Sequence, residues 1–318
     1  MRRARSPRRP LVTAALALTI AAACGGGDAG SGGNGDGLSG IIRIDGSSTV
    51  APLSEAAAER FQEEHAGVRV TVGTSGTGGG FEKFCAGETD ISDASRAIEQ
   101  DEIDACKAKG IAYEELRVAL DGLSVVVNPD NDWAECLTVP QLAKIWGPDS
   151  KVKSWREVDP AFPDVPLELF GAGTDSGTFD YFTAAVNGEE GASRTDYNAT
   201  EDDNVTVNGV AGTKGALGYL GLSYVEQNEG KVKGVQVDGG GGCVAPNKAT
   251  VQDGTYKPLG RPLFVYVKAA ALERPEVAAF VDFYIENSTG IAEQALFVPL
   301  TPAQQEEARG KVEQLKGG

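Results

Sequence analysis

The chain of 318 residues holds 46 acidic against 29 basic residues, a single histidine and five cysteines, and its formal net charge is −17 at pH 7. This acidity excludes nucleic acid as an expected partner, because nucleic-acid binding needs a basic face. It also repels anions at long range. An anion site in this chain therefore has to work through short-range, desolvated contacts.

The first 23 residues have the pattern of an export signal. Five arginines precede an apolar run over residues 11–23, which is shorter than the roughly 20 residues that a bilayer-spanning helix needs. The run ends in Ala21-Ala22-Ala23-Cys24, which resembles a bacterial lipoprotein cleavage site. We therefore expect residues 1–23 to be a lipoprotein signal peptide and Cys24 to carry the lipid. An ordinary signal peptide with an incidental cysteine is the alternative, and both the Sec and the Tat export routes stay open.

Residues 24–40 consist almost entirely of Gly, Ser, Asn and Asp. This composition cannot bury a core and is typical of a flexible tether. A folded body is expected from Ile41 onward, and its length suits two domains better than one. The sequence thus predicts an exported protein that is anchored to the outer face of the cytoplasmic membrane, or a periplasmic one.

The body alternates strand-like apolar runs with amphipathic stretches, which indicates an α/β fold with largely parallel sheets. Strands are expected at residues 41–45, 68–72, 123–128, 167–170, 232–237 and 263–267. Helices are expected at residues 49–64, with Pro52 in the first turn, and at residues 276–286.

Four cysteines remain in the body, and an even number in an exported chain predicts two disulfides. Cys85 with Cys106 would close a local loop, which leaves Cys136 with Cys243, although the sequence leaves the connectivity open. A zinc site is disfavoured, because the chain has no C-x-x-C pair and its one histidine is His65. We expect no metal and no cofactor.

Three segments share one design, in which a short strand runs into a loop of Gly, Ser and Thr that opens a helix. They are residues 45–49, 73–81 and 173–179. A helix start exposes unpaired N–H groups and a partial positive charge, and glycine lets an anion approach the backbone. For each loop alone, a helix cap is the usual interpretation. Three together favour an oxyanion site, provided that they converge on one cleft.

These loops match no common catalytic motif. None reads as a nucleotide P-loop, a dinucleotide fingerprint or a nucleophile elbow. A serine triad would have to use His65, which follows two glutamates near the end of the first expected helix. We therefore do not expect an enzyme, and an exported phosphatase is the alternative from that class.

The segment over residues 89–96 adds charged groups to the candidate site. Arg96 is suited to bidentate, charge-assisted bonds to an oxyanion, and a salt bridge to Asp93 or Asp90 is the alternative. Phosphate near neutral pH carries a proton that it can donate, whereas sulfate does not. A buried carboxylate would accept that bond and repel sulfate, which gives selectivity.

The order of Asp-Gly-Ser-Ser-Thr, Ser-Gly-Thr-Gly-Gly-Gly-Phe, Asp-Ile-Ser-Asp-Ala-Ser-Arg and Gly-Thr-Asp-Ser-Gly-Thr-Phe resembles the PstS-type phosphate-binding proteins of ABC transporters. The similarity runs from Ile41 to the end of the chain. It implies a two-lobed periplasmic-binding-protein fold of type II, with the ligand cleft between the lobes. Lobe I would comprise residues 41–120 plus 262–318, and lobe II residues 121–261.

The resemblance also implies the function of an extracytoplasmic solute-binding lipoprotein, a monomer that captures inorganic phosphate and delivers it to the permease subunits of an ABC transporter. A receptor for sulfate or molybdate, or a surface adhesion or signalling role, are the alternatives. The expected phosphate-binding residues are Ser47, Ser48, Thr49, Ser75, Gly76, Thr77, Asp93, Ser95, Arg96, Asp175, Ser176, Gly177 and Thr178.

The chain departs from the family pattern at two positions. The aspartate with which the family accepts the phosphate proton aligns with Ser95, and the family's arginine before the third loop aligns with Ala172. We therefore expect Arg96 to supply the positive charge, with Arg194 in reserve. Asp93 or Asp175 would accept the proton.

Overall fold

A computed structural model of the protein describes residues 37–174 and 176–317. The expected signal peptide, the lipidated Cys24, the tether up to residue 36 and the candidate ligand Asp175 lie outside these residues. No helix of the described part of the chain is both long and apolar enough to cross a bilayer.

The larger sheet has parallel strands at its two ends and antiparallel strands in its middle. Its order is β2 (Val68–Gly73), β1 (Gly40–Gly46), β3 (Ile91–Ala94), β12 (Gly260–Lys268), β4 (Tyr113–Val127), β8 (Ala216–Gly221), β6 (Glu168–Ala172) and β7 (Asn198–Thr200), and β9 (Lys233–Gly234) also pairs with β4. β1 runs parallel to β2 and β3, and β6 runs parallel to β7 and β8. The expectation of largely parallel sheets is therefore correct only at the two ends.

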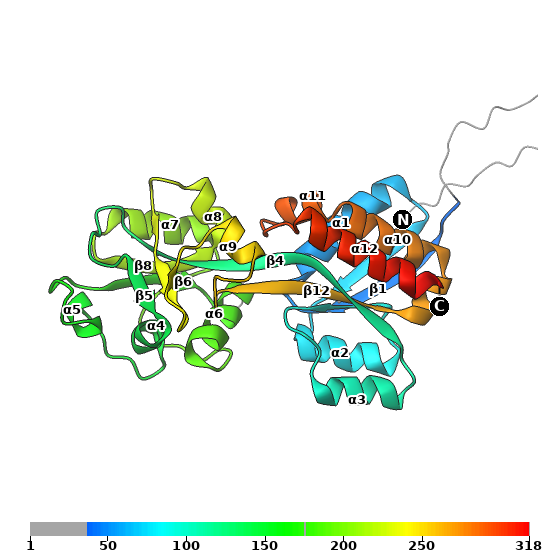
Figure 1. The fold of residues 1–318 in the computed structure, drawn as a ribbon, viewed down its shortest axis with the longest axis horizontal. Helices are drawn as coiled ribbons and strands as arrows, with labels where there is room; N and C mark the ends of the chain where they lie inside the picture. The colour runs from blue at the N-terminus through cyan, green and yellow to red at the C-terminus, as the bar shows by residue number, and fades with distance from the viewer. Residues whose placement is uncertain (1–36, 175, 318) are drawn as a thin grey trace, which may run out of the picture. The chain divides into compact units, whose positions relative to one another are not determined.

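The antiparallel middle follows from the path of the chain. The chain leaves the first group of elements along β4 and returns to it along β12, so the two neighbouring strands must run in opposite directions. Figure 1 shows β4 and β12 as the long strands that connect the two groups. Their ladder has a register shift between Leu263 and Phe264.

Two expected strands differ from those observed. The run over residues 123–128 is only the second half of β4, whose first half carries Glu114, Glu115 and Arg117 and does not read as an apolar run. The run over residues 232–237 is split into β9 and β10 (Gln236–Asp238). β10 leaves the large sheet and joins β5 (Cys136–Thr138) and β11 (Cys243–Val244) in a second, three-stranded sheet.

The helices follow the strands as expected for an α/β fold. They are α1 (Ala51–Glu64), α2 (Gly76–Ala86), α3 (Gln100–Ala108), α4 (Val139–Trp146), α5 (Trp155–Val158), α6 (Gly177–Asn187), α7 (Asp203–Gly212), α8 (Leu222–Gln227), α9 (Lys248–Gln252), the 3-10 helix η1 (Ala269–Glu273), α10 (Pro275–Glu286), α11 (Ser288–Gln294) and α12 (Pro302–Gly317).

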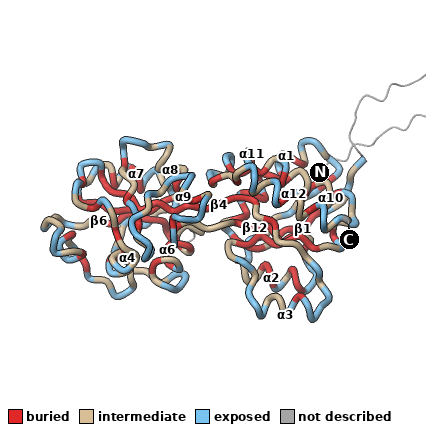
Figure 2. The backbone as a smooth tube through the Cα atoms, viewed as in Figure 1, coloured by how far each residue is buried: buried red, intermediate tan, exposed pale blue. Residues whose placement is uncertain are grey.

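The buried apolar side chains form two large clusters rather than one. The first draws its members from residues 42–119 and 263–312. The second draws them from residues 120–259, with Val298 and Leu300 added. Figure 2 shows the buried backbone concentrated along the strands of both groups, with exposed residues on the outer helices. Each cluster is the core of one lobe. β4 and β12 pass from one core to the other, and the segment with Val298 and Leu300 also reaches into the second core.

Two disulfides are present, and they join the expected pairs. Cys85–Cys106 ties α2 to α3, and Cys136–Cys243 ties β5 to β11 in the small sheet. Each disulfide links elements within one lobe, so the two bonds stabilise the separate cores and do not join the lobes.

Asp93 lies in the core of the first lobe. Its side chain is fully buried, and its Oδ1 accepts a 2.8 Å hydrogen bond from Ser54 Oγ, which lies 3.3 Å from the hydroxyl of Tyr284. Burial raises the pKa of Asp93 from 3.8 to about 8. The bond from Ser54 opposes the shift, and the charges of Asp45 and Glu55 add to it. Within the described residues Asp93 Oδ2 has no hydrogen-bond partner.

This burial predicts a pH-dependent cost to stability. Between about pH 4 and pH 8 the folded chain keeps a proton on Asp93 that the unfolded chain has lost, so a rise in pH destabilises the fold by up to about 1.4 kcal/mol per pH unit. Asp93→Asn removes this dependence. Urea unfolding at pH 5 and at pH 8 is expected to show that the variant gains about 2–4 kcal/mol over the natural chain across this interval.

Asp253→Asn is the matched control. Hydrogen bonds from Thr255 lower the pKa of the exposed Asp253, so Asp253 does not titrate between pH 5 and pH 8, and its charge does not contribute to the shift of Asp93. An Asp93→Asn variant whose stability follows the same pH curve as the natural chain would contradict the prediction.

Candidate functional site

A cavity of about 380 Å³ lies where loops of the first lobe face α6 of the second. Its lining comes from the β1–α1 loop, the start of α2, the segment after β3, α6 with the loop that follows it, and β12. The lining residues are Ser47, Ser48, Thr49, Gly76, Thr77, Gly78, Ser95, Arg96, Asp180, Tyr181, Ala184, Glu190 and Arg261.

The first glycine-rich loop turns sharply from β1 into α1. Gly46 has a φ of 149°, and a Cβ at this position would lie 2.1 Å from the carbonyl oxygen of Asp93, so only glycine fits. Ser47 N donates to that same oxygen at 2.9 Å. The turn places Ser48 and Thr49 in the cavity wall at the start of α1, where backbone N–H groups lack helical acceptors.

In the second loop, one residue is bound to β1 and the next two line the cavity. Ser75 Oγ donates to Asp45 Oδ1 at 2.5 Å, so its side chain is turned toward β1, and Ser75 does not line the cavity. The next residues, Gly76 and Thr77, do line it. Thr77 Oγ1 lies 3.1 Å from Ser95 Oγ and accepts a hydrogen bond from Ser95 N at 3.3 Å, which joins this loop to the segment after β3.

The third loop meets the first across the two lobes. Ser176 caps α6, because its Oγ accepts from Thr178 N at 3.2 Å. A Cβ on Gly177 would lie 2.5 Å from Thr49 Oγ1, so the two helix starts are in direct contact at this glycine. Thr178 lines a smaller neighbouring cavity of about 150 Å³. The third loop therefore lies against the first, although α6 lines the main cavity through Asp180, Tyr181 and Ala184 and not through residues 176–178.

Arg96 lines the cavity, but its guanidinium is already paired. Its two terminal nitrogens each lie 2.8 Å from an oxygen of Glu102, and Nε lies 3.3 Å from Glu99. The alternative pairing with Asp90 or Asp93 is wrong. Asp90 pairs with Arg274 at 2.8 Å, and Asp93 is buried behind the first loop.

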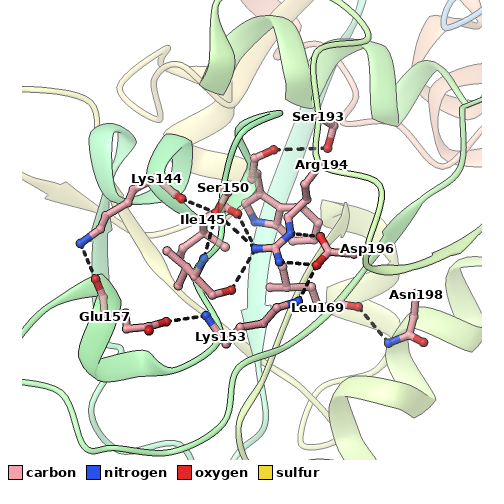
Figure 3. Close-up of polar contacts among 12 residues, drawn as sticks. Lys144, Ile145, Ser150, Lys153, Glu157, Leu169, Ser193, Arg194, Asp196 and Asn198 are labelled. Carbon is pink, nitrogen blue, oxygen red and sulfur yellow. Dashed lines mark hydrogen bonds and ion pairs between the residues drawn. The ribbon is translucent and has the colours of Figure 1, made fainter.

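Arg194 has a structural place away from the main cavity. Its guanidinium donates to Asp196 at 2.6 and 3.0 Å and to the carbonyl oxygens of Ile145 and Val152 at 3.0 and 3.1 Å. Figure 3 shows this network around Arg194 at the end of α4. Only 3% of Arg194 is exposed and it is absent from the lining, so the reserve role that the sequence suggested for it is wrong.

The positive charge that sequence reasoning missed is Arg261 on β12. It stands directly opposite Asp121 in the β12–β4 ladder, and its Nε and one terminal nitrogen each lie 3.3 Å from Asp121 Oδ2. The guanidinium lies 3.6 Å from the centre of the Tyr181 ring. It also donates to Thr49 Oγ1 at 3.3 Å and to the carbonyl oxygen of Ser95 at 3.4 Å. Arg261 thus touches both lobes at the cavity.

One signal in the sequence could have pointed to this pair. Asp121 interrupts a long apolar stretch, and Arg261 stands at the edge of another. Charged residues inside apolar runs tend to find a partner, because an unpaired buried charge is costly. Only the register of β4 against β12 tells which two charges meet.

Two carboxylates, Asp180 and Glu190, also line the cavity, and sequence reasoning considered neither. Burial raises the pKa of Asp180, the charge of Glu190 adds to the shift, and Arg261 opposes it. Asp93, which the sequence offered as an acceptor, does not line the cavity.

Within residues 37–174 and 176–317, no group of three or more His, Cys, Asp or Glu side chains is placed to hold a metal ion. The cavity wall instead combines hydroxyl groups, helix starts and the guanidiniums of Arg261 and Arg96, of which Arg96 is paired with Glu99 and Glu102. Such a set suits a small oxyanion.

Known proteins share both the sequence and the fold. A model of the PBP superfamily domain matches residues 28–288. Protein SphX of Synechococcus elongatus is 48% identical over 263 residues, which is 82% of this chain and 77% of SphX. The phosphate-binding protein PstS of Staphylococcus saprophyticus is 39% identical over 307 residues, which is 96% of this chain and 93% of PstS.

The crystal structure of a possible phosphate binding protein from Planctomyces limnophilus matches with a TM-score of 0.84 and 48% identity, and the match covers 88% of this chain and 99% of that one. The expected two-lobed α/β fold is confirmed. The extent of these matches leaves one conclusion: the chain belongs to the PBP superfamily and, within it, to the family of the PstS-type phosphate-binding proteins.

Proposed function

We propose that the protein is an extracytoplasmic receptor that captures inorganic phosphate in the cavity between its lobes and delivers it to an ABC permease. It acts by binding and performs no catalysis. The observation that carries the proposal is the meeting of three helix starts and Arg261 around one cavity, in a chain 39% identical to a phosphate-binding protein PstS.

The lobes of this receptor comprise residues 41–120 plus 262–318 and residues 121–261. The two apolar clusters support these bounds, because their membership changes between residues 119 and 120 and again between residues 259 and 263, with Val298 and Leu300 as the exceptions that pack in the second cluster. Since β4 and β12 are the strands that pass between the clusters, bending of this pair would open and close the cavity.

In this proposal phosphate accepts hydrogen bonds from the first and second loops and from the segment after β3. Thr49, Thr77 and Ser95 supply hydroxyl groups, and the starts of α1 and α2 supply N–H groups. Arg261 supplies the main positive charge and Arg96 a weaker one, because Glu99 and Glu102 already neutralise Arg96. Of the remaining expected ligands, Ser47, Ser48 and Gly76 belong to the cavity wall, and Ser176, Gly177 and Thr178 complete the site from the second lobe.

The membrane attachment is part of the same proposal. A lipid on Cys24 and the tether over residues 24–40 would hold a monomeric receptor at the outer face of the cytoplasmic membrane. The two disulfides support an oxidising compartment outside the cytoplasm.

Calorimetry tests the proposed function directly. The mature chain, unfolded to remove bound ligand and then refolded, is expected to bind phosphate at least about 100-fold more tightly than sulfate, a difference of about 2.7 kcal/mol. Equal affinities for the two anions would contradict a phosphate receptor, and tighter sulfate binding would favour the sulfate alternative.

The assignment of the positive charge predicts unequal effects of two arginine substitutions. Arg261→Gln removes charge-assisted bonds worth about 1.5–3 kcal/mol each, so phosphate affinity is expected to fall by about 10- to 150-fold. Arg96→Gln, the matched control, is expected to lower it by less than about threefold, because Glu99 and Glu102 already engage this guanidinium.

Arg261→Gln also leaves the buried charge of Asp121 without its partner, which could destabilise the fold. The double variant with Asp121→Asn removes that charge as well, so it tests the loss of Arg261 without an unpaired carboxylate. Titration calorimetry gives the affinities, and thermal unfolding confirms that each variant is folded. A larger loss in Arg96→Gln than in Arg261→Gln would overturn the assignment.

The contact at Gly177 predicts that a single methyl group weakens binding. The Cβ of Gly177→Ala would lie 2.5 Å from Thr49 Oγ1, so the two helix starts cannot meet as they do here, and phosphate affinity is expected to fall about tenfold or more. Fold stability should not fall, because alanine is favoured over glycine in a helix. Gly212→Ala, at the end of α7 with open space around its Cβ, is the control and is expected to bind normally. Equal affinities in the two variants would show that this contact is not needed.

A further inference from the structure

Tyr181 contributes an aromatic ring to the wall of the main cavity. It lies in the second turn of α6, which begins at Gly177, and only 7% of it is exposed. The guanidinium carbon of Arg261 lies 3.6 Å from the centre of this ring. A cation over the face of an aromatic ring is attracted to it, and the attraction is larger where water is excluded. The contact joins a helix of the second lobe to the cation on β12.

The hydroxyl of Tyr181 fixes the place of the ring. It donates a 2.7 Å hydrogen bond to the carbonyl oxygen of Pro258, which stands three residues before Arg261 in the chain. The hydroxyl end of the ring is thus held by the segment that leads into β12, and the face of the ring contacts a side chain of that same strand. Burial raises the pKa of Tyr181, so the hydroxyl keeps its proton and remains a donor near neutral pH.

An aromatic ring can hold a guanidinium without using its N–H groups. At 3.6 Å no N–H group has room to point at the ring, so the planar guanidinium of Arg261 lies flat on it and its donors point sideways. Arg96 has the opposite arrangement, because both of its terminal nitrogens are bonded to Glu102 at 2.8 Å. The hydrogen bonds of Arg261 to protein acceptors are longer, at 3.3 to 3.4 Å, and therefore weaker. An incoming anion can take over these donors.

Asp121 is the acceptor that competes with an anion for the guanidinium. It is buried on the neighbouring strand, and its Oδ2 lies 3.3 Å from two nitrogens of Arg261. If the ring were absent, the guanidinium could turn toward Asp121 and form a short bidentate pair. Water would also reach the uncovered face and weaken the attraction of the charge for an anion. Both changes would lower the affinity of the site while the charge itself stayed in place.

We propose that Tyr181 is the residue that positions Arg261 for the anion. Its ring keeps the guanidinium from closing onto Asp121 and shields one face of it from water. The inference rests on the proposed function, because it explains how the cation of that site is held ready. Tyr181 acts through Arg261 and not by a bond of its own to the ligand, since its hydroxyl is bonded to Pro258.

A double-mutant cycle tests this role, with phosphate affinity measured by calorimetry in the mature chain. Tyr181→Leu removes the ring and is expected to lower the affinity about tenfold. Tyr181→Phe keeps the ring and is expected to lower it by less than about threefold. In a chain that carries Arg261→Gln and Asp121→Asn, Tyr181→Leu is expected to change the affinity by less than about twofold, because the group on which the ring acts is already gone. A merely structural role in the second core predicts the same loss in both backgrounds.

Tyr197→Phe is the matched control for the lost hydroxyl. Tyr197 also belongs to the second lobe, and its hydroxyl donates to the carbonyl oxygen of Ala172 at 2.7 Å, but it does not line the main cavity. This variant is expected to bind phosphate as the natural chain does. Thermal unfolding shows which variants are folded. Tyr181→Met, which keeps a long apolar side chain without a ring, gives the same comparison should Tyr181→Leu fail to fold.

The outcomes separate this inference from the function on which it rests. If the natural chain binds phosphate and Tyr181→Leu binds it equally well, the positioning role is overturned while the receptor function stands. A tenfold loss in both backgrounds, or a loss in Tyr181→Phe as large as that in Tyr181→Leu, also overturns the role of the ring. A natural chain that does not bind phosphate overturns the function and the inference together.

Discussion

The ion pair between Arg261 and Asp121 is the interaction on which the site depends. It joins the two strands that pass between the lobes, at the point where the cavity begins. The Asp121 side chain is largely buried, so loss of either partner would leave an uncompensated charge, which commonly costs about 3–5 kcal/mol. The pairing, together with the ring of Tyr181, fixes the guanidinium where it reaches both lobes. The cavity therefore has a rigid positive group even though its walls come from separate loops.

An acidic chain can bind an anion because the repulsion by its net charge and the attraction by the cavity act over different distances. The net charge of −17 is spread over the surface and screened by salt beyond about 8–10 Å. The cavity wall has N–H groups, hydroxyl groups and the guanidiniums of Arg261 and Arg96 beside the carboxylates of Asp180 and Glu190, and in the proposed site the donors act on the ligand at hydrogen-bond range. The placement of these groups in the cavity therefore accounts for phosphate binding, and the negative surface does not concentrate anions in general.

Sequence patterns predicted the parts of the site that depend on local structure. Both disulfides join the expected pairs, and residues of the first two glycine-rich loops and of the segment after β3 line one cavity, while their ligand roles stay proposals. Arg261 was missed because its role depends on the register between strands that are 140 residues apart. The sequence does not show that Asp45 binds the hydroxyl of Ser75 or that Glu102 pairs with Arg96, because these contacts depend on the fold.

The register shift in the β12–β4 ladder lies just after Arg261, between Leu263 and Phe264. An irregular step in a ladder interrupts the pairing and lets the strands flex locally. In the closure proposed above, this step would act as the pivot, and Arg261 beside it would keep its partner Asp121 while the lobes move. An incoming anion would then meet the guanidinium of Arg261 already in position, and the helix starts would close around the anion afterwards.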